Sequence, residues 1–161
     1  MKLNSLLAIS LMSISVAFPA LANTQSEVIA TLQQKTSVPV EFPGSLPNTE
    51  GENIYFNWSA DSSSYNVNFD YTQDCGGATA CNIGSFSAIK GAQIQSKSDY
   101  SGNDEYQYIK LNNGYNAVFI NTCGASCTTL VEWKVNGAVY SVYLKNGTKE
   151  EILKIANSVY N

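Results

Sequence analysis

Four cysteines are the residues of this sequence best suited to chemistry, and they occur as two close pairs. Cys75 and Cys81 bracket one short Gly/Ala-rich segment, and Cys123 and Cys127 bracket another. An even cysteine count outside the cytoplasm indicates disulfide bonds, and four cysteines allow three pairings. We favour the two local pairings because each intervening segment is small and can curl. Bonds this local should shape loops more than hold the fold, since closing so short a loop stabilises by about 2 kcal/mol.

Other uses of the cysteines fit less well. A four-cysteine zinc site commonly has two to four residues between paired ligands, and the wider spacing of Cys75 and Cys81 departs from that pattern. A redox centre would have Cys-x-x-Cys, which neither pair has. We therefore predict no metal ligands and no cofactor.

Two kinds of catalytic arrangement deserve comparison with the sequence. Ser87 and Lys90 match the Ser-x-x-Lys of serine penicillin-recognising enzymes, and residues 145–147 (Lys-Asn-Gly) resemble their Lys-Thr-Gly. That motif must open a helix, whereas Ser87 lies in a predicted strand. Paired carboxylates could cleave glycosidic bonds; the candidates are Asp70, Asp74, Asp99, Asp104 and Glu132. None forms a recognisable arrangement, so we predict no catalytic residues, and a small hydrolase remains the alternative.

An acidic segment and many tyrosines offer two further binding chemistries. Asp99, Asn103, Asp104 and Glu105 could ligate calcium, but they lack the order and the glycine of an EF-hand loop. The ten tyrosines stand mostly in predicted strands, where aromatic rings usually pack in a core. An exposed Tyr/Asn/Ser strip could instead bind a glycan or a protein partner.

The charge composition excludes some partners. The chain has no arginine and no histidine, and its net charge is −4. Without arginine there is no planar fork for phosphate or guanine, and a negative protein is repelled by nucleic acid. We therefore predict no nucleic-acid partner.

The N-terminal residues have the layout of a secretory signal peptide. Lys2 precedes an apolar stretch over residues 3–18, and Ala20 and Ala22 supply the small residues of a cleavage site. The stretch is short and contains several polar residues, so a membrane anchor fits less well. We predict a signal peptide over residues 1–22, cleaved after Ala22, and a periplasmic or secreted protein without an integral membrane segment.

The residue pattern after that point predicts helix, then strands, then helix. Residues 23–37 form a predicted short N-terminal helix, opened by a capping box at residues 24–27. Alternating apolar residues predict strands near residues 54–58, 65–71 and 85–89. Asn-Gly at 113–114 and at 136–137 predicts two further hairpins. A second capping box at 148–151 opens a C-terminal helix.

These elements define one domain over residues 38–161. We predict an α+β fold: an antiparallel β-meander of about six or seven strands, with the C-terminal helix and the short N-terminal helix packed on one face. Residues 65–69 and 115–119 share a Tyr-Asn-x-x-Phe pattern, and each leads into a cysteine loop. If this shared pattern marks a repeated structural unit, both cysteine loops lie at the same end of the sheet.

Two resemblances can be named on particular residues. Residues 74–81 (DCGGATAC), 123–127 (CGASC) and 149–158 (KEEILKIANS), with Trp133 and Tyr140, resemble a group of uncharacterised exported bacterial proteins with paired short cysteine loops. Residues 131–159 are similar to the strand–strand–helix end of DUF4367-type extracytoplasmic domains. The second resemblance implies extracytoplasmic sensing, but this chain lacks the membrane segment that such regulators often have. Neither implies a catalytic residue or a ligand.

The sequence thus favours an exported, non-enzymatic binding or interaction domain, stabilised by two local disulfides. This interpretation rests on the signal-like N-terminus, the cysteine loops and the absence of a catalytic constellation in the sequence. The alternatives are the small exported hydrolase, which would use carboxylates or Ser87 with Lys90, and a structural envelope-associated protein.

Overall fold

A computed structural model of the chain describes residues 24–100 and 104–160. The predicted signal peptide, residues 1–22, lies outside the described residues. The elements, in chain order, are α1 (Gln25–Lys35), β1 (Tyr55–Asp61), β2 (Ser64–Asp70), β3 (Asn82–Lys90), the 3₁₀-helix η1 (Lys97–Asp99), β4 (Glu105–Lys110), β5 (Asn116–Cys123), β6 (Cys127–Val135), β7 (Ala138–Lys145) and α2 (Lys149–Asn157).

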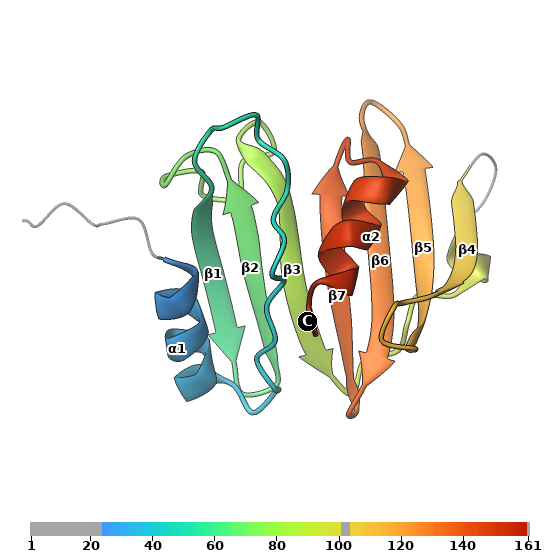
Figure 1. The fold of residues 1–161 in the computed structure, drawn as a ribbon, viewed down its shortest axis with the longest axis horizontal. Coiled ribbons are helices and arrows are strands. Elements are labelled where there is room, and N and C mark those ends of the chain that lie inside the picture. Colours follow the sequence, from blue (N-terminus) through green and yellow to red (C-terminus); the bar gives the residue numbers. More distant parts are fainter. Residues whose placement is uncertain (1–23, 101–103, 161) are drawn as a thin grey trace, which may run out of the picture.

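The strands form one seven-stranded sheet in the order β1-β2-β3-β7-β6-β5-β4, and every pairing is antiparallel (Figure 1). The chain first builds β1, β2 and β3 from one edge, then β4, β5 and β6 from the other. β7 enters last and joins β3 to β6 at the centre of the sheet. The predicted antiparallel fold with two helices is confirmed.

Alternation along the strands separates the two faces of the sheet. Tyr65, Val67 and Phe69 of β2 point to one face and are almost fully buried. Phe86 lies opposite Val67 in the register, so it shares that face. Asn66 and the other alternate residues of β2 therefore lie on the opposite face.

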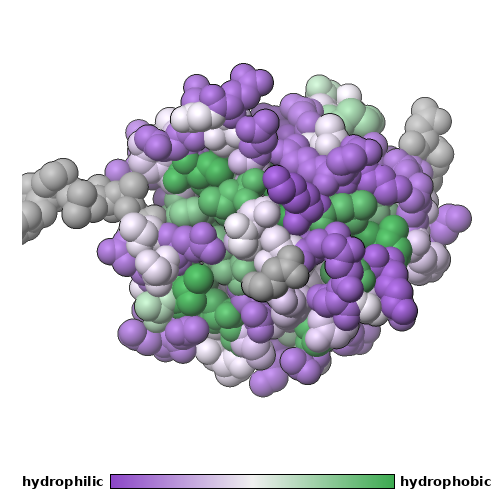
Figure 2. Space-filling view, in the orientation of Figure 1, coloured by the Kyte–Doolittle hydropathy of each residue, from purple (hydrophilic) through white to green (hydrophobic). Residues whose placement is uncertain are grey.

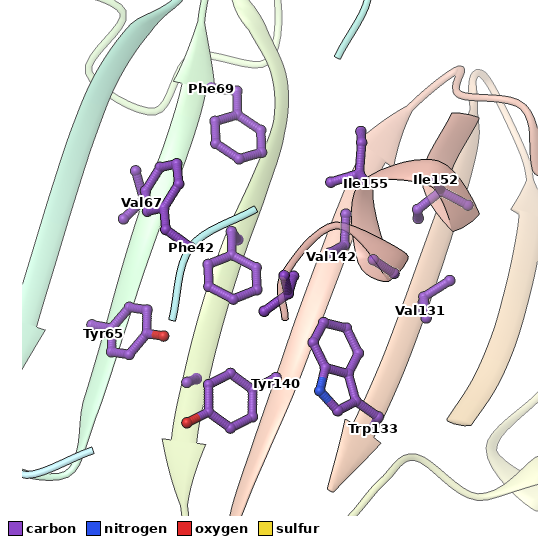
Figure 3. Close-up of a cluster of buried hydrophobic side chains, with 14 of the residues drawn as sticks. Phe42, Tyr65, Val67, Phe69, Val131, Trp133, Tyr140, Val142, Ile152 and Ile155 are labelled. Carbon is purple, nitrogen blue, oxygen red and sulfur yellow. The ribbon is translucent and has the colours of Figure 1, made fainter. Parts of the chain in front are cut away.

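The helices cover the apolar face. α1 lies beside β1, the segment 36–54 crosses in front of β2 and β3, and α2 lies in front of β7 and β6 (Figure 1). Figure 3 shows Ile152 and Ile155 of α2 over Val131 and Val142 of the sheet. Ile152 and Ile155 are fully buried. Figure 2 shows that apolar groups reach the surface of this face only as separate patches.

Aromatic rings form much of the core beneath the helices. Trp133 and Tyr140, on neighbouring strands, stack with centroids 5.9 Å apart. Phe86 continues the stack at 6.3 Å from Tyr140. The buried ring of Phe42, from the 36–54 segment, meets Phe86 at 6.1 Å. Tyr65, Trp133 and Tyr140 are therefore packing residues, whereas Tyr108 of β4 is 78% exposed.

The two helix starts differ from each other. Thr24 and Glu27 form the predicted reciprocal capping box of α1. At α2 the prediction is only half correct: Thr148 accepts from the Glu151 N–H at 3.1 Å, but the Glu151 carboxylate accepts instead from the backbone N–H of Asn48, at 3.0 Å. That carboxylate ties the 36–54 segment to α2. Within the described residues no helix is both long and apolar enough to cross a membrane.

Candidate binding site

Both disulfides are local. One joins Cys75 to Cys81, in the connection between β2 and β3. The other joins Cys123 to Cys127, which face each other at the end of the β5–β6 hairpin with Cα atoms 4.0 Å apart. The first loop begins a short turn after the end of β2, and the second begins at the last residue of β5. Both loops are therefore held in fixed shapes on a rigid sheet.

The two loops lie at the same end of the sheet. β2, β5 and β7 all point to the upper edge in Figure 1, which is where the loops lie. β7 pairs with both β3 and β6, so its last residue stands between them. Lys145 Nζ donates to the carbonyl oxygen of Thr79 in the first loop at 2.6 Å. The Asn146 N–H donates to the carbonyl oxygen of Cys127 in the second at 2.8 Å.

We call this edge the loop end: residues 75–81, 123–127 and 145–148. The Tyr-Asn-x-x-Phe pattern shared by residues 65–69 and 115–119 predicts that both loops lie at one end of the sheet. The two cysteine hairpins are nevertheless not rotated copies of each other. β2 and β5 run in the same direction and face the same core, but β3 and β6 lie on opposite sides of them. No rotation superposes two such hairpins. The shared sequence pattern therefore reflects strand composition and not an internal repeat.

A pocket of about 300 Å³ opens beside the first loop and the β7–α2 turn. Its lining consists of Asn48, Tyr71, Ala80, Asn82, Ile83, Leu144, Lys145, Asn146, Gly147 and Glu151. A second hollow of about 370 Å³ shares Asn48 and Tyr71 with it and extends along Thr49, Glu50 and Glu52. Tyr71 is 40% exposed, and its backbone N–H donates to Cys81 at 2.8 Å. Together the two hollows form a groove at the loop end, with Tyr71 common to both.

A buried carboxylate orients one amide of the pocket. Asp70 is fully buried, and its two oxygens accept from Asn82 Nδ2 at 2.8 Å and from Asn57 Nδ2 at 2.7 Å. Asn82 Nδ2 also donates to the carbonyl oxygen of Gly84 at 3.1 Å. The amide nitrogen of Asn82 is thus committed to the protein, and its oxygen is left for a ligand.

The other polar side chains of the pocket are held in the same way. Asn146 Oδ1 accepts from the Cys127 N–H at 3.1 Å, which leaves its amide nitrogen for a ligand. Lys145 Nζ uses one of its three N–H donors in the hydrogen bond to the Thr79 carbonyl oxygen. Glu151 accepts from Asn48 through Oε1, which leaves Oε2. Each group is fixed through one atom and offers another, so the pocket is organised before a ligand arrives.

The turn after β7 depends on Asn146 and Gly147. Asn146 has φ +54°, in the left-handed region that asparagine tolerates better than most residues. A Cβ on Gly147 would come within 2.6 Å of Leu144 Cβ, so only glycine lets the turn pack against β7. This Lys-Asn-Gly segment resembles an enzyme motif in sequence; here it shapes a wall of the pocket.

The structure does not assemble the serine–lysine pair that the alternative hydrolase would use. Ser87 and Lys90 are three residues apart on β3, so their side chains leave opposite faces of the sheet. Lys90 Nζ contacts the Ser37 hydroxyl at 3.5 Å, and Ser87 faces Asn66 and Ser141 on the neighbouring strands. A nucleophile and its base must be within hydrogen-bond reach, and these two are not arranged to be.

The buried carboxylates Asp70 and Glu132 do not pair either. They stand on β2 and β6, three strand spacings apart, or about 14 Å, beyond the separation that glycosidases use. Glu132 instead holds the segment that leaves β3. It accepts from the backbone N–H of Gln95 at 2.9 Å and from Ser141 Oγ at 3.3 Å.

The remaining acidic candidates have local roles or lie apart. Asp99 accepts from the Ser96 N–H at 3.0 Å and caps η1. Asp74 lines a separate hollow with Asn57 and Asn68. Asn103 lies outside the described residues. Within those residues no three His, Cys, Asp or Glu side chains gather as metal ligands would.

The pocket residues themselves were not predicted from the sequence. Asn82 and Tyr71 flank the first cysteine loop, and Glu151 belongs to a helix cap, so each has an ordinary local explanation. Their only shared signal is proximity to a cysteine loop or to Asn-Gly after a strand. No protein-family model, no curated protein and no solved structure matches this chain.

Proposed function

We propose that this chain is an exported binding or interaction domain that recognises its partner with the loop end of the sheet. The observation that carries the proposal is the preorganised pocket: Asn82, Asn146, Lys145 and Glu151 are each anchored through one polar atom and leave another uncommitted. Side chains held in this way have already lost the freedom that binding would otherwise remove.

Export is supported by the two disulfides and by the signal-like N-terminal sequence. Disulfides persist in oxidising compartments and are rare in the cytosol. The same two features support a periplasmic or secreted location. The loops suit recognition because they are short, disulfide-closed and carried on a seven-stranded sheet.

The test is affinity capture with a matched pair of variants. The oxidised protein is immobilised and exposed to an envelope extract of its source organism, and retained protein and glycan are both identified. Beside it run a variant with all four cysteines changed to serine, checked to be folded, and Tyr108→Ala, which alters an exposed ring in the edge strand β4. One partner retained by the wild type and Tyr108→Ala but lost by the cysteine variant supports recognition at the loop end. Equal retention by all three, or by none, rejects it; the latter favours a structural envelope role.

A further inference from the structure

The chemistry of the pocket at the loop end narrows the class of ligand. Resting on the proposed binding function, we infer that the groove takes neutral sugar units of an oligosaccharide, one in the pocket beside Asn82 and Asn146 and the next in the hollow beyond Tyr71. The inference rests on three features: the polar atoms of the pocket that are left for a ligand, the exposed ring of Tyr71, and the charged residues that line the groove.

The uncommitted atoms are a mixture of donors and acceptors. Asn82 Oδ1 and Glu151 Oε2 accept, whereas Asn146 Nδ2 and Lys145 Nζ donate. A sugar hydroxyl both donates and accepts, so adjacent hydroxyls satisfy both kinds of group. A carboxylate or phosphate only accepts, so it would offer no donor to the oxygens of Asn82 and Glu151.

Tyr71 supplies the apolar surface that a sugar ring needs. It follows β2 directly, and its hydrogen bond to Cys81 fixes its backbone against the first disulfide loop. Tyr71 is part of the lining of both hollows. An aromatic ring offers a flat apolar face for the C–H groups of a sugar and a hydroxyl for its polar edge. Because Tyr71 belongs to both hollows, it can contact two successive units, which is why an oligosaccharide fits better than a single sugar.

The charges of the groove disfavour anionic glycans. Glu50, Glu52 and Glu151 line it against the single cation Lys145. The chain has no arginine, and its net charge is −4. A uronic acid or a phosphorylated sugar would be repelled by this field and would find no bidentate partner.

The test is a titration of the oxidised, ¹⁵N-labelled protein with three probes: cellotriose, triacetylchitotriose and trigalacturonic acid. We expect at least one neutral trisaccharide to shift the side-chain amide signals of Asn82 and Asn146, and trigalacturonic acid to leave them in place. Tyr71→Ala should weaken the binding of that trisaccharide about tenfold. The matched control Tyr108→Ala removes an exposed tyrosine of the edge strand β4 and should leave the affinity unchanged.

The other outcomes separate this inference from the proposed function. No shift at Asn82 and Asn146 with either neutral trisaccharide at millimolar concentration overturns the sugar inference, and a protein partner captured through the loop end would still uphold the binding function. Tighter binding of trigalacturonic acid also overturns the neutral class. Equal loss of affinity in Tyr71→Ala and Tyr108→Ala overturns the placement in this groove.

Discussion

Asn82 donates its side-chain amide to the buried carboxylate of Asp70 at 2.8 Å, so a residue of the core sets the orientation of a residue of the pocket. Asn57 supplies the second amide to the same carboxylate. Among the described residues, the two side-chain oxygens of Asp70 accept from these two amides. Burying a carboxylate is costly unless its oxygens are hydrogen-bonded, and this arrangement meets that condition while fixing Asn82.

Replacing Asp70 by alanine should therefore destabilise the protein and loosen the pocket together. It leaves the amides of Asn57 and Asn82 without their acceptor, at a cost of about 1–3 kcal/mol in the free energy of unfolding. Urea unfolding measures this value. Ser87→Ala, on the neighbouring strand, has no hydrogen bond of its side chain to lose among the described contacts and should change stability by less than about 0.5 kcal/mol. Equal values for the two variants would contradict the role given to Asp70.

Two glycines should respond very differently to the same added methyl group. A Cβ on Gly84 of β3 would lie 2.2 Å from the carbonyl oxygen of Tyr143, a backbone atom at the centre of the sheet. Gly84→Ala should cost about 3 kcal/mol or prevent folding. Gly124, in the second cysteine loop, has nothing within 4 Å of the same position and has no positive φ. Gly124→Ala should stay near wild-type stability in the same urea experiment; a large loss there would mean that the loop is packed in solution.

Each disulfide should contribute modestly and independently to stability. The bonds close loops with sequence separations of 6 and 4, for which the loss of unfolded-state entropy is worth about 2 kcal/mol each. Changing either pair to serine should lower the free energy of unfolding by about that amount and leave the sheet intact, as circular dichroism would show. The two losses should add in the four-serine variant, because the bonds share no residue. Unfolding of either double variant in buffer would show that the loops hold the fold and do not merely shape it.

Alkaline pH should destabilise the protein through its buried tyrosines. Burial, with some repulsion from neighbouring ionisable groups, raises the pKa of Tyr65 and Tyr140 well above the usual value of 10 and raises the pKa of Tyr160 to about 12. In the unfolded chain these phenols ionise near pH 10. Because the pKa is higher in the folded state, their contribution to stability is fully present below pH 10. It is lost as pH rises through the folded pKa.

The expected loss is about 1.4 kcal/mol per pH unit for each of these tyrosines above pH 10. Urea unfolding between pH 8 and pH 11.5 measures the slope. Tyr140→Phe also removes the hydrogen bond to the Pro39 carbonyl oxygen, at 2.8 Å, so it lowers stability at every pH. Its slope above pH 10 should nevertheless be smaller than that of the wild type by the share of one tyrosine. An unchanged slope would mean that Tyr140 ionises equally in both states.

The sequence pattern was sufficient to predict the fold class, because strands, tight turns and helix caps are determined by residues close together in the sequence. Alternation such as Tyr65, Val67 and Phe69 puts apolar groups on one face of a strand whatever its neighbours are. Asn136 adopts positive φ in the tight turn between β6 and β7, as its Asn-Gly pair predicts. The N-cap of α1 formed for the same reason, since Thr24 and Glu27 are only three residues apart.

The site was decided by contacts that join distant parts of the chain. Nothing near residue 145 indicates that β7 inserts between β3 and β6, yet this insertion carries Lys145 to Thr79 and Asn146 to Cys127. Likewise Glu151 has the spacing of a capping box but is satisfied by Asn48, 103 residues away in the sequence. The local sequence determined which segments became strands, helices and closed loops. Only the tertiary structure determined which of them meet, because strand order depends on how the whole sheet buries its apolar face.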